Sequence, residues 1–460
     1  MISGDTIAAI ATAPGRGGVA VVRVSGSEAF AIGRKVTSAD GQMVGWSVDR
    51  MANRISAQHA LFHDLSSEQR INRPSEQVID EGILLVFRGP NSYTGEDVVE
   101  FQCHGGSVTP RRVLEACLAA GARLARRGEF TQRAFLNGKL DYGQAESVLD
   151  LIDAKTARAA DAALEGLSGR RSRACRALYE SALDLSTRLE HALDIDEGEL
   201  PVGFADELRV ASCELRVRIE EAIRKANEGK LLRTGALVVL AGPPNAGKSS
   251  LMNALLEENR AIVSETPGTT RDSIEACIDL DGWPIRLVDT AGLREAKDEI
   301  EGEGVKRAQD LIAKADVVVW LQVPSFESRV PGCGSHNSQL ETRNPQHIAI
   351  HPKCDLGRGE GLNVSSKTGE GLEELKRVIV AELEEKVTAS DCGDIPEGDV
   401  TAYHEALAFL PQASGFRPQT DLVLLANAVR SAAERLGAAV GATYSSDMLD
   451  KLFSRFCVGK

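Results

Sequence analysis

The sequence predicts a multidomain protein that joins an N-terminal α+β domain, a helical domain and a P-loop α/β domain with a parallel sheet. Three observations lead to this fold class. With 460 residues, the chain is too long to fold around a single hydrophobic core, and typical domain sizes favour about three domains. The hydrophobic pattern changes along the chain from short β-rich runs to helical spacing, and then to alternating strands and helices. The segment 242–250 has the glycine spacing of a phosphate-binding loop.

The first domain is expected over residues 1–137, where short β-rich runs alternate with Gly, Pro and Asn turns. Its strand candidates are "GVAVVRVSG", "EGILLVFRG" and "VVEFQCHGG", and one helix is expected near residues 110–120. Residues 138–229 then change to helical periodicity and form the first part of a helical domain. In this part the heptad positions are Leu208, Leu215 and Ala222, and Gly229 is the expected C-cap.

The segment 230–386 alternates apolar strands with helical patterns, which predicts a parallel sheet with crossover helices. Its strand candidates are "ALVVLAG", "PIRLVDT", "ADVVVWLQV" and "HIAIH", and the polar stretch 324–346 is expected to be an irregular loop. Residues 387–460 are helical again. Their last helix is expected to have Ser445 or Ser446 as its cap and an apolar face of Leu449, Leu452, Phe453 and Phe456. A helical domain split by an inserted α/β domain explains this order.

The composition is that of a globular protein, with 43% hydrophobic and 26% charged residues. The net charge of −14 argues against a protein that coats nucleic acid non-specifically, although it is compatible with a local basic patch. The nine cysteines are scattered, without a C-x-x-C pair, which indicates reduced thiols. Because "MISGDTIAAI" lacks the features of a signal peptide and no apolar run reaches about 20 residues, we expect a cytoplasmic protein.

The candidate phosphate site is "GPPNAGKSS", which fits G-x-x-x-x-G-K-[ST] between a strand and a helix. Backbone amides of such a loop wrap the phosphates, while Lys248 can neutralise their oxygens as a catalytic group and the Ser249 hydroxyl can bind Mg²⁺. The residues expected to line the nucleotide here are Asn245, Ala246, Gly247, Lys248, Ser249 and Ser250.

Two further motifs predict a GTPase switch in a Ras-like domain. In "DTAG", which is Asp289, Thr290, Ala291 and Gly292, the carboxylate faces the magnesium and the last amide can sense a γ-phosphate. "GTTRD" at 268–272 supplies Thr270 to the metal in the triphosphate state. Leu293 stands where many GTPases have the glutamine that orients the attacking water, so another group must organise catalysis.

With these residues in view, nearly the whole chain resembles the MnmE (TrmE) family of tRNA modification GTPases. The resemblance rests on "DTIAAIATAPGRGGVAVVRVSG", "GPNSYTGEDVVEFQCHGG", "RRGEFTQRAFLNGKLDYGQAESVLDLIDA", the P-loop, "GTTRD", "DTAGLRE" and the terminal "FCVGK". It implies an N-terminal domain that binds a formyl-tetrahydrofolate and forms a homodimer. It also implies a partnership with the flavoprotein MnmG, which carries the FAD, to build a carboxymethylaminomethyl group on the wobble uridine of certain tRNAs.

The resemblance assigns residues to three further sites. Folate contacts would fall on Arg23, Glu100, Lys139 and Lys460, which without the resemblance are ordinary surface charges. A K⁺ ion that stabilises transition-state charge would be bound by Asn245 and by the loop of Ser264, Thr266 and Thr269. Glu301 would orient the catalytic water, although composition alone describes it as a solvated acid in "KDEIEGEG".

Two features remain open between a functional and a structural reading. Cys457 is a candidate nucleophile for uridine chemistry, but a cysteine on a terminal helix more often packs than reacts. The run "GRRSRACRALYE" can contact tRNA phosphates or form a solvated helix face, and composition favours the latter. Its basic residues are Arg170, Arg171, Arg173 and Arg176.

The guanine-reading loop departs from the family pattern N-K-x-D, because Pro352 stands in place of the asparagine. Asp355 can still pair with the N1 and N2 hydrogens of guanine, and the Lys353 stem can still cover the base. A second base-binding loop is formed by Ser365, Ser366 and Lys367. Losing one or two hydrogen bonds predicts affinity that is weakened roughly tenfold with guanine preference retained. His351 is a candidate to replace the lost amide.

The function expected from these residues is a homodimeric, K⁺-activated GTPase that modifies the wobble uridine of tRNA together with MnmG. The alternative is a GTP-dependent switch or assembly factor, for example in ribosome maturation, that modifies no base. A nucleotide-free scaffold is a third possibility, motivated by Pro352 and opposed by the intact P-loop and DTAG. The folate-like segment and the "FCVGK" tail favour the modification enzyme, because an assembly factor has no use for either.

Overall fold

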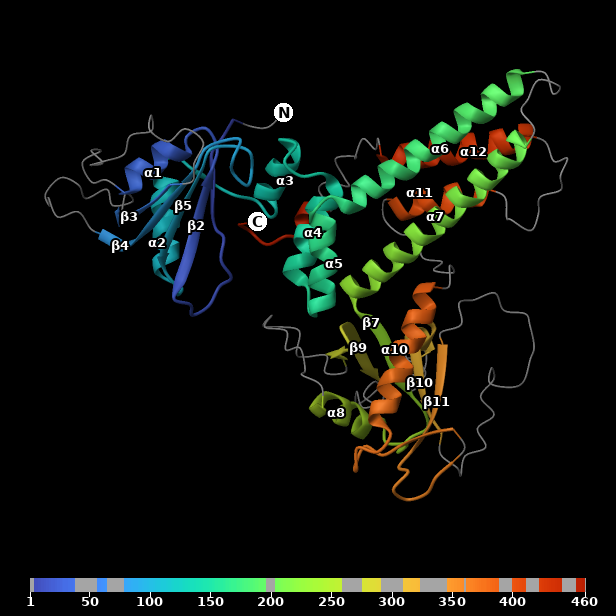
Figure 1. The fold of residues 1–460 in the computed structure, drawn as a ribbon. Helices are drawn as coiled ribbons and strands as arrows, with labels where there is room; N and C mark the ends of the chain where they lie inside the picture. Colours follow the sequence, from blue (N-terminus) through green and yellow to red (C-terminus); the bar gives the residue numbers. More distant parts are fainter. Residues whose placement is uncertain are drawn as a thin grey trace, which may run out of the picture. The chain divides into compact units, whose positions relative to one another are not determined.

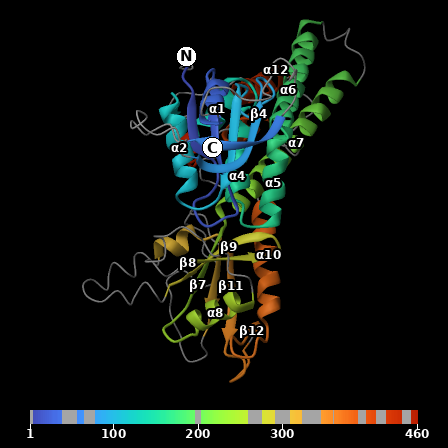
Figure 2. The same ribbon diagram turned by 90° about the vertical axis from the view of Figure 1, so that its left-hand side faces the viewer.

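The computed structural model describes residues 4–37, 56–63, 78–195, 203–258, 275–290, 309–322, 346–359, 361–388, 399–410, 422–440 and 452–459. Figures 1 and 2 show the elements of two compact units. The first comprises Met1–Leu149, Leu167–Gly169 and Thr443–Lys460, and the second comprises Asp150–Gly166 and Arg170–Ala442. Among the described residues, every helix is too short or too polar to cross a membrane.

The first unit contains a mixed sheet of six strands in the order β3-β4-β5-β2-β1-β6. Neighbouring strands are antiparallel except β1 and β6, which are parallel. The strands are β1 (Ile7–Ile10), β2 (Val19–Ser25), β3 (Ser56–His63), β4 (Val78–Phe87), β5 (Val98–His104) and β6 (Arg123–Leu124). The helices are α1 (Ala29–Thr37), α2 (Thr109–Ala119), α3 (Glu129–Leu136) and the first part of α4 (Tyr142–Asp153). The helix expected near 110–120 is thus confirmed, whereas α1 and α3 were not predicted.

The period-2 alternation of β2 separates a core face from a polar face of this sheet. Ala20, Val22 and Val24 are buried in a cluster with side chains of α1 and α2, including Ile32 and Val113. Since successive side chains point to opposite faces, Arg23 lies on the other face, directly opposite Glu100 of β5. The sequence pattern of one strand therefore sets the position of a charged pair.

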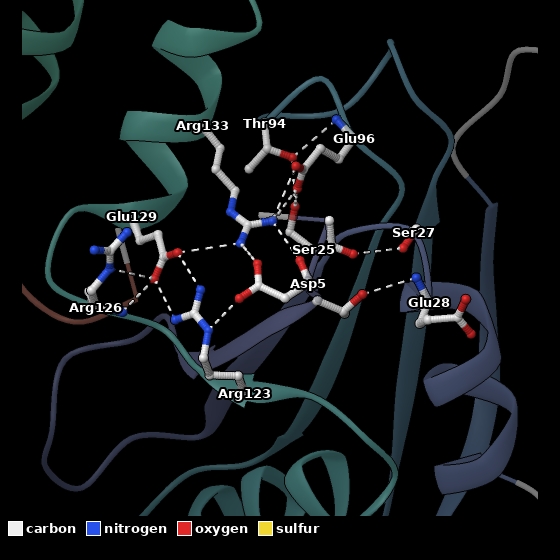
Figure 3. A network of polar contacts seen from close by, with 12 residues as sticks. Asp5, Ser25, Ser27, Glu28, Thr94, Glu96, Arg123, Arg126, Glu129 and Arg133 are labelled. Atoms are coloured by element: carbon white, nitrogen blue, oxygen red, sulfur yellow. Dashed lines mark hydrogen bonds and ion pairs between the residues drawn. The ribbon is translucent and has the colours of Figure 1, made fainter. Parts of the chain in front are cut away.

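A buried ion-pair network joins the N-terminal segment, the loop before β5 and α3 (Figure 3). Arg123 donates two hydrogen bonds to Glu129, at 2.7 and 3.0 Å, and one to Asp5 at 2.6 Å. Arg133 donates to Asp5 at 2.9 Å and to Glu96 at 3.1 Å. Because Glu129 and Arg133 are almost fully buried, each needs the partners that the others supply.

The chain's last residues pack within the first unit. Leu452, Phe453 and Phe456 are buried against Ala145 and Leu149 of α4, which confirms the apolar face predicted for three of its four members. Gly459 lies so close to β1 that a Cβ at this position would be 2.1 Å from the Ile10 carbonyl oxygen, so a larger residue would displace the tail. Ser445, Ser446 and Leu449 lie outside the described residues.

The second unit contains a helical core. Its helices are α5 (Ala157–Leu167), α6 (Arg170–Asp194), α7 (Phe204–Thr234), α11 (Asp399–Phe409) and α12 (Leu422–Val440). Leu208 and Leu215 are buried in this core, as their heptad register predicts, together with Leu189 of α6 and Val429 of α12.

The prediction that Gly229 caps α7 is wrong. The helix continues to Thr234, and Gly235 is its C-cap, with φ of 77° and an N–H that donates to the Leu231 carbonyl at 2.9 Å. Leu232, in the added turn, is buried against the core of the α/β sheet. This tertiary contact stabilises the last turn beyond a glycine that the helix tolerates at a modest cost.

The second unit also contains the α/β sheet, in the order β12-β11-β10-β7-β9-β8. All neighbouring pairs are parallel except β8 with β9. Its elements are β7 (Ala236–Ala241), α8 (Lys248–Glu258), β8 (Glu275–Leu280), β9 (Trp283–Asp289), β10 (Val317–Leu321), β11 (Gln346–Pro352), β12 (Leu362–Val364) and α10 (Leu372–Thr388). The four predicted strands and the parallel sheet are confirmed, whereas β8 and β12 were not predicted. The expected loop at 324–346 lies outside the described residues, except for Gln346, which begins β11.

Arg158 of α5 joins the helices of this unit to the β8–β9 hairpin. Its guanidinium carbon lies 4.1 Å from the centroid of the Trp283 ring, and it donates a hydrogen bond of 2.6 Å to Glu228 of α7. A Cβ on Gly282, in the hairpin turn, would lie 3.0 Å from the Arg158 Cβ. The contact combines a cation–π interaction, an ion pair and close backbone packing.

Glu129→Gln is expected to destabilise the first unit by about 3–5 kcal/mol at pH 7, because it removes one charge from a buried pair. Burial alone would raise the pKa of Glu129, but hydrogen bonds from Arg123 and from the Arg126 N–H hold that pKa at about 2. Since this folded-state pKa lies below the ordinary value of 4.5, the stabilisation is present above about pH 4.5 and is lost as the pH falls toward 2. Hydrogen exchange of α3 peptides in the full chain at pH 7 and pH 4 measures this.

The matched control is Glu221→Gln, which removes an equally low-pKa carboxyl from a half-exposed pair with Arg224. Surface ion pairs contribute little to the free energy of unfolding, so this variant is expected to keep nearly all of the hydrogen-exchange protection of α7, the helix that carries residue 221. Equal effects of the two substitutions would contradict a special role for the buried network.

Candidate functional site

The phosphate loop lies between β7 and the first turn of α8, in the second unit. Its backbone uses left-handed conformations at Asn245, with φ of 60°, and at Gly247, with φ of 98°. Lys248 is buried and donates hydrogen bonds of 3.0 and 2.9 Å to the carbonyls of Gly242 and Pro243. The loop thus curves around its own lysine, which places the ammonium group and the first N–H groups of α8 together, as phosphate binding requires.

The magnesium-binding side chains of the sequence prediction meet at the edge of this loop. The Ser249 hydroxyl donates to the Asp289 carboxylate at 2.5 Å, although the residues are 40 positions apart. Asp289 and the adjacent Thr290 are buried, and the Thr290 hydroxyl donates to the Leu240 carbonyl at 3.0 Å. Two hard oxygen donors fit Mg²⁺, which takes few protein ligands and completes its shell with water and phosphate oxygens. Elsewhere in the described ranges, His, Cys, Asp and Glu side chains do not gather in threes as a metal site.

The two predicted base-binding loops are hydrogen-bonded to each other and to the P-loop. Lys353 has a φ of 61°, and its ammonium donates to the Asn245 carbonyl at 2.9 Å. The buried Ser365 hydroxyl donates to the Asp355 carboxylate at 2.8 Å and accepts from the Lys367 N–H at 3.3 Å. Ser366 stands in the same turn. The structure therefore brings together Asn245, Lys353, Asp355, Ser365, Ser366 and Lys367.

Pro352 is the last residue of β11 and lies opposite Val364 of β12. A proline is tolerated at a strand end, where its missing N–H leaves the rest of the ladder intact. The neighbouring His351 packs its ring against Gly359, since a Cβ on that glycine would lie 2.3 Å from its Nδ1. That nitrogen is buried and has no hydrogen-bond partner in the described part of the chain. This geometry lends no support to His351 as a substitute for the lost amide.

Several predicted site residues lie outside the described residues. They comprise the expected switch and potassium positions Ser264, Thr266, Thr269 and Thr270, the DTAG residues Ala291 and Gly292, Leu293, the expected water-orienting Glu301, and the terminal Lys460.

Two of the predicted folate residues, Arg23 and Glu100, lie on the polar face of the first unit's sheet. Arg23 donates to Glu100 at 2.7 Å, and both side chains are mostly buried. The Arg23 guanidinium also lies 5.3 Å from the centroid of the Tyr93 ring and 5.6 Å from that of Phe130. Lys139 follows α3 in the chain, and its ammonium donates to the Pro90 carbonyl, in the loop of Tyr93, at 3.1 Å. Arg23 and Glu100 thus share one strand pair, and Lys139 is hydrogen-bonded to the loop beside them.

Tyr93 and Phe130 were not predicted from the sequence. Burial raises the pKa of the Tyr93 hydroxyl, which bonds to the Thr131 hydroxyl at 2.8 Å. With Ile7, Ala9, Ala125 and Phe130 it forms an apolar patch beside the Arg23 pair. No spacing rule marks aromatic residues that come from a loop and a distant helix, so only the folded chain shows this grouping.

Cys457 is exposed, and its carbonyl accepts a hydrogen bond from the Gly128 N–H at 3.4 Å. The neighbouring Val458 forms an isolated β-bridge with Arg127. The tail is thus held by the buried side chains of Leu452, Phe453 and Phe456 and by backbone pairing. The exposed Cys457 sulfur takes no part in this packing, so the interpretation of Cys457 as a packing residue has no support. Its catalytic role stays a prediction.

A phosphate loop, a hydrogen-bonded serine–aspartate pair suited to Mg²⁺ and a K-x-D loop on one mainly parallel sheet define a P-loop protein of the guanine-nucleotide class. Two family models cover most of the chain. "GTP-binding protein TrmE N-terminus" matches residues 6–139, and "MnmE helical domain" matches residues 143–457.

Curated relatives agree over the full length. This chain is similar to proteins described as tRNA modification GTPase MnmE from Dichelobacter nodosus and Ectopseudomonas mendocina. The first is 39% identical over 100% of both chains, and the second is 40% identical over 99% of both. The chain belongs to the MnmE family.

Pro352→Asn is expected to tighten guanine-nucleotide binding about tenfold, because an asparagine amide can add one or two hydrogen bonds between the base loop and its neighbours. Pro352→Ala is the matched control, since it restores the backbone N–H without the amide and is expected to change affinity little. Titration calorimetry with GDP measures both. Equal affinities of the two variants would show that the side chain at 352 does not contact the base or the P-loop.

Proposed function

We propose that this protein is a K⁺-activated GTPase that acts as a homodimer and, with the flavoprotein MnmG, installs the 5-carboxymethylaminomethyl group on the wobble uridine of certain tRNAs in the cytoplasm. Family membership supports the tRNA-modifying part of this proposal. The observation that carries the GTPase part is the convergence of Lys248, Ser249 and Asp289 with the Asp355–Ser365 pair on one sheet edge.

In the proposed reaction, Lys248 leaves its loop carbonyls and donates to the β and γ phosphate oxygens, while the backbone amides of 245–250 hold the phosphates. Ser249 and Asp289, which are hydrogen-bonded to each other, would hold Mg²⁺, and a bound Mg²⁺ would neutralise charge on these phosphates. Thr270 is the proposed metal contact of the triphosphate state. Because the protein forms no covalent bond with the phosphoryl group, positioning and charge stabilisation account for the catalysis.

Base selection is proposed to rest on Asp355. Its carboxylate accepts from the N1 and N2 hydrogens of guanine, whereas adenine offers no matching donor pair. Ser365 holds this carboxylate in place at 2.8 Å, and the Lys353 stem is held beside the P-loop by its bond to the Asn245 carbonyl. These contacts support retained guanine preference despite Pro352.

Potassium activation is proposed for the P-loop residue Asn245, with Ser264, Thr266 and Thr269 as further ligands and Glu301 as the group that orients water. The left-handed backbone at Asn245 supports a special role, since such a conformation is uncommon for residues other than glycine. A monovalent cation beside the phosphates would supply the positive charge that other GTPases obtain from an arginine.

A one-carbon folate, such as 5-formyltetrahydrofolate, is the proposed ligand of the first unit. Arg23, Glu100 and Lys139 would bind its polar groups, and Lys460 is the proposed fourth contact. The buried Arg23–Glu100 pair beside Tyr93 supports this, because it joins hydrogen-bonding charges to an aromatic surface suited to a flat ring. A ribosome-assembly switch, the alternative function, has no need of this arrangement.

GTP hydrolysis by the full-length protein is expected to be faster in KCl than in NaCl, with little turnover of ATP or XTP. Asn245→Ala is expected to remove the difference between the two salts while Mg²⁺-dependent GTP binding persists. Phosphate release at equal ionic strength measures both effects. Equal rates of the unmodified protein in K⁺ and Na⁺ would contradict potassium activation, and base-indifferent turnover would contradict the role of Asp355.

Binding of 5-formyltetrahydrofolate separates the modification enzyme from the assembly factor. The full chain is expected to bind it, and Arg23→Gln is expected to weaken binding at least about tenfold, because a hydrogen bond to a charged group contributes about 1.5–3 kcal/mol. Arg111→Gln, an exposed arginine of the same unit, is the control. Failure of the unmodified protein to bind the folate would favour the assembly-factor alternative.

A further inference from the structure

The strongest charge concentration outside the sites above is at the beginning of α6. Four arginines occur within seven residues, at 170, 171, 173 and 176, and no acidic residue stands between Glu165 and Glu180. Arg170, Arg173 and Arg176 are exposed, and their three-residue spacing places them along one side of the helix. We call these three residues the arginine face. In a chain of net charge −14, such a run of positive charge is exceptional.

Helix stability does not explain the arginine face. The first turn of a helix is the positive end of its macrodipole and favours acidic side chains, yet α6 has none there. Arg170 does pair with Glu165, but both side chains are more than 60% exposed, and such a pair contributes little. Positive charge in this first turn is unfavourable for the helix, and a bound anion would offset it.

The arginine face is short and has a defined end. Along the same side of α6, the next charged residues are Glu180 and Asp184. They line a cavity of about 460 Å³ between α6 and α7, whose other charged lining residues are Arg188, Glu214 and Arg218. At 1.5 Å per residue, Arg170 and Arg176 are about 9 Å apart along the helix axis. The positive surface therefore suits a short run of negative charges rather than a broad acidic surface.

The neighbouring side chains favour a phosphate chain over a protein. Between and beside the arginines, the exposed positions are Ala174 and Ala177. Protein interfaces need larger apolar or aromatic anchors in a buried centre, and these alanines supply none. A guanidinium matches a phosphate bidentately, and phosphate contacts require neither a pocket nor an apolar anchor.

We propose that the arginine face binds the phosphodiester backbone of RNA. The inference rests on the proposed function in that tRNA is the RNA in question. Contacts of this kind are independent of base sequence, so they orient the RNA on the helical part of the protein while other groups select the uridine. This face differs from an ordinary solvated helix face in two ways. Its positive charges begin at the N-terminus of the helix, where the macrodipole disfavours them, and its neighbouring side chains are small.

The double variant Arg173→Ala/Arg176→Ala tests the proposal in the full-length protein. The matched control is Arg430→Ala/Arg435→Ala, which removes two half-exposed arginines from α12 and changes the net charge equally. The probe is a tRNA transcript with uridine at the wobble position, titrated at several KCl concentrations. GTP hydrolysis without RNA is measured in the same preparations and is expected to be unchanged in both variants.

The arginine-face variant is expected to bind tRNA about tenfold or more weakly at low salt. The slope of log affinity against log salt is expected to fall by about 2, because two phosphate contacts are lost. Unchanged affinity and slope, or equal losses in the control, would overturn the proposal and leave the GTPase assignment standing. Failure of the unmodified protein to bind tRNA while it hydrolyses GTP would refute both this proposal and its tRNA premise.

Discussion

The parallel pairing of β7 with β9 and β10 is the constraint on which the nucleotide-binding part of the structure depends. Since the carboxyl ends of parallel strands lie at one edge of a sheet, the loop after Ala241 and the end of β9 become neighbours. This allows Ser249 to reach Asp289. Addition of β11 beside β10 brings Lys353 to the same edge, where it bonds to a P-loop carbonyl 108 positions earlier in the chain. One edge thus collects groups for phosphate, metal and base.

In the first unit, antiparallel strand pairing and buried ion pairs bring together residues that are far apart in the chain. Register places Arg23 opposite Glu100, and the ion-pair network of Arg123, Arg133 and Glu129 holds the segments around them. The network costs desolvation, so its value lies in fixing which segments meet rather than in adding much net stability. The fixed segments keep the Arg23–Glu100 pair beside the rings of Tyr93 and Phe130.

The arginines of the helical part show how environment sets the role of a residue type. Arg158 is covered by an indole ring and paired with Glu228, so it links α5 and α7 to the hairpin between the two switch motifs. The arginine face of α6 has small, exposed neighbours, and its three side chains are themselves exposed. In the first arrangement the guanidinium packs between helices and hairpin, whereas in the second it lies on the surface.

The sequence alone determined the kind of chemistry and much of the architecture. The P-loop, DTAG and K-x-D motifs predicted candidate residues for phosphate, metal and base binding because each motif depends on residues close together in the chain. The structure joins Ser249 to Asp289 and Ser365 to Asp355 by hydrogen bonds. Alternating and heptad patterns predicted the four strands and the buried positions of α7 because those patterns follow from backbone periodicity.

Contacts between distant residues were decided only by tertiary structure. The end of α7 lies beyond Gly229 because Leu232 is buried in the sheet core, and no local rule registers that burial. The strand β8 was not predicted from its own residues and is defined by its antiparallel pairing with β9. Tyr93, from a loop, and Phe130, from a helix, meet around Arg23 only in the folded chain. In each case the structure is stabilised by burial against a partner that is far away in the sequence. A prediction from neighbouring residues cannot include that contribution.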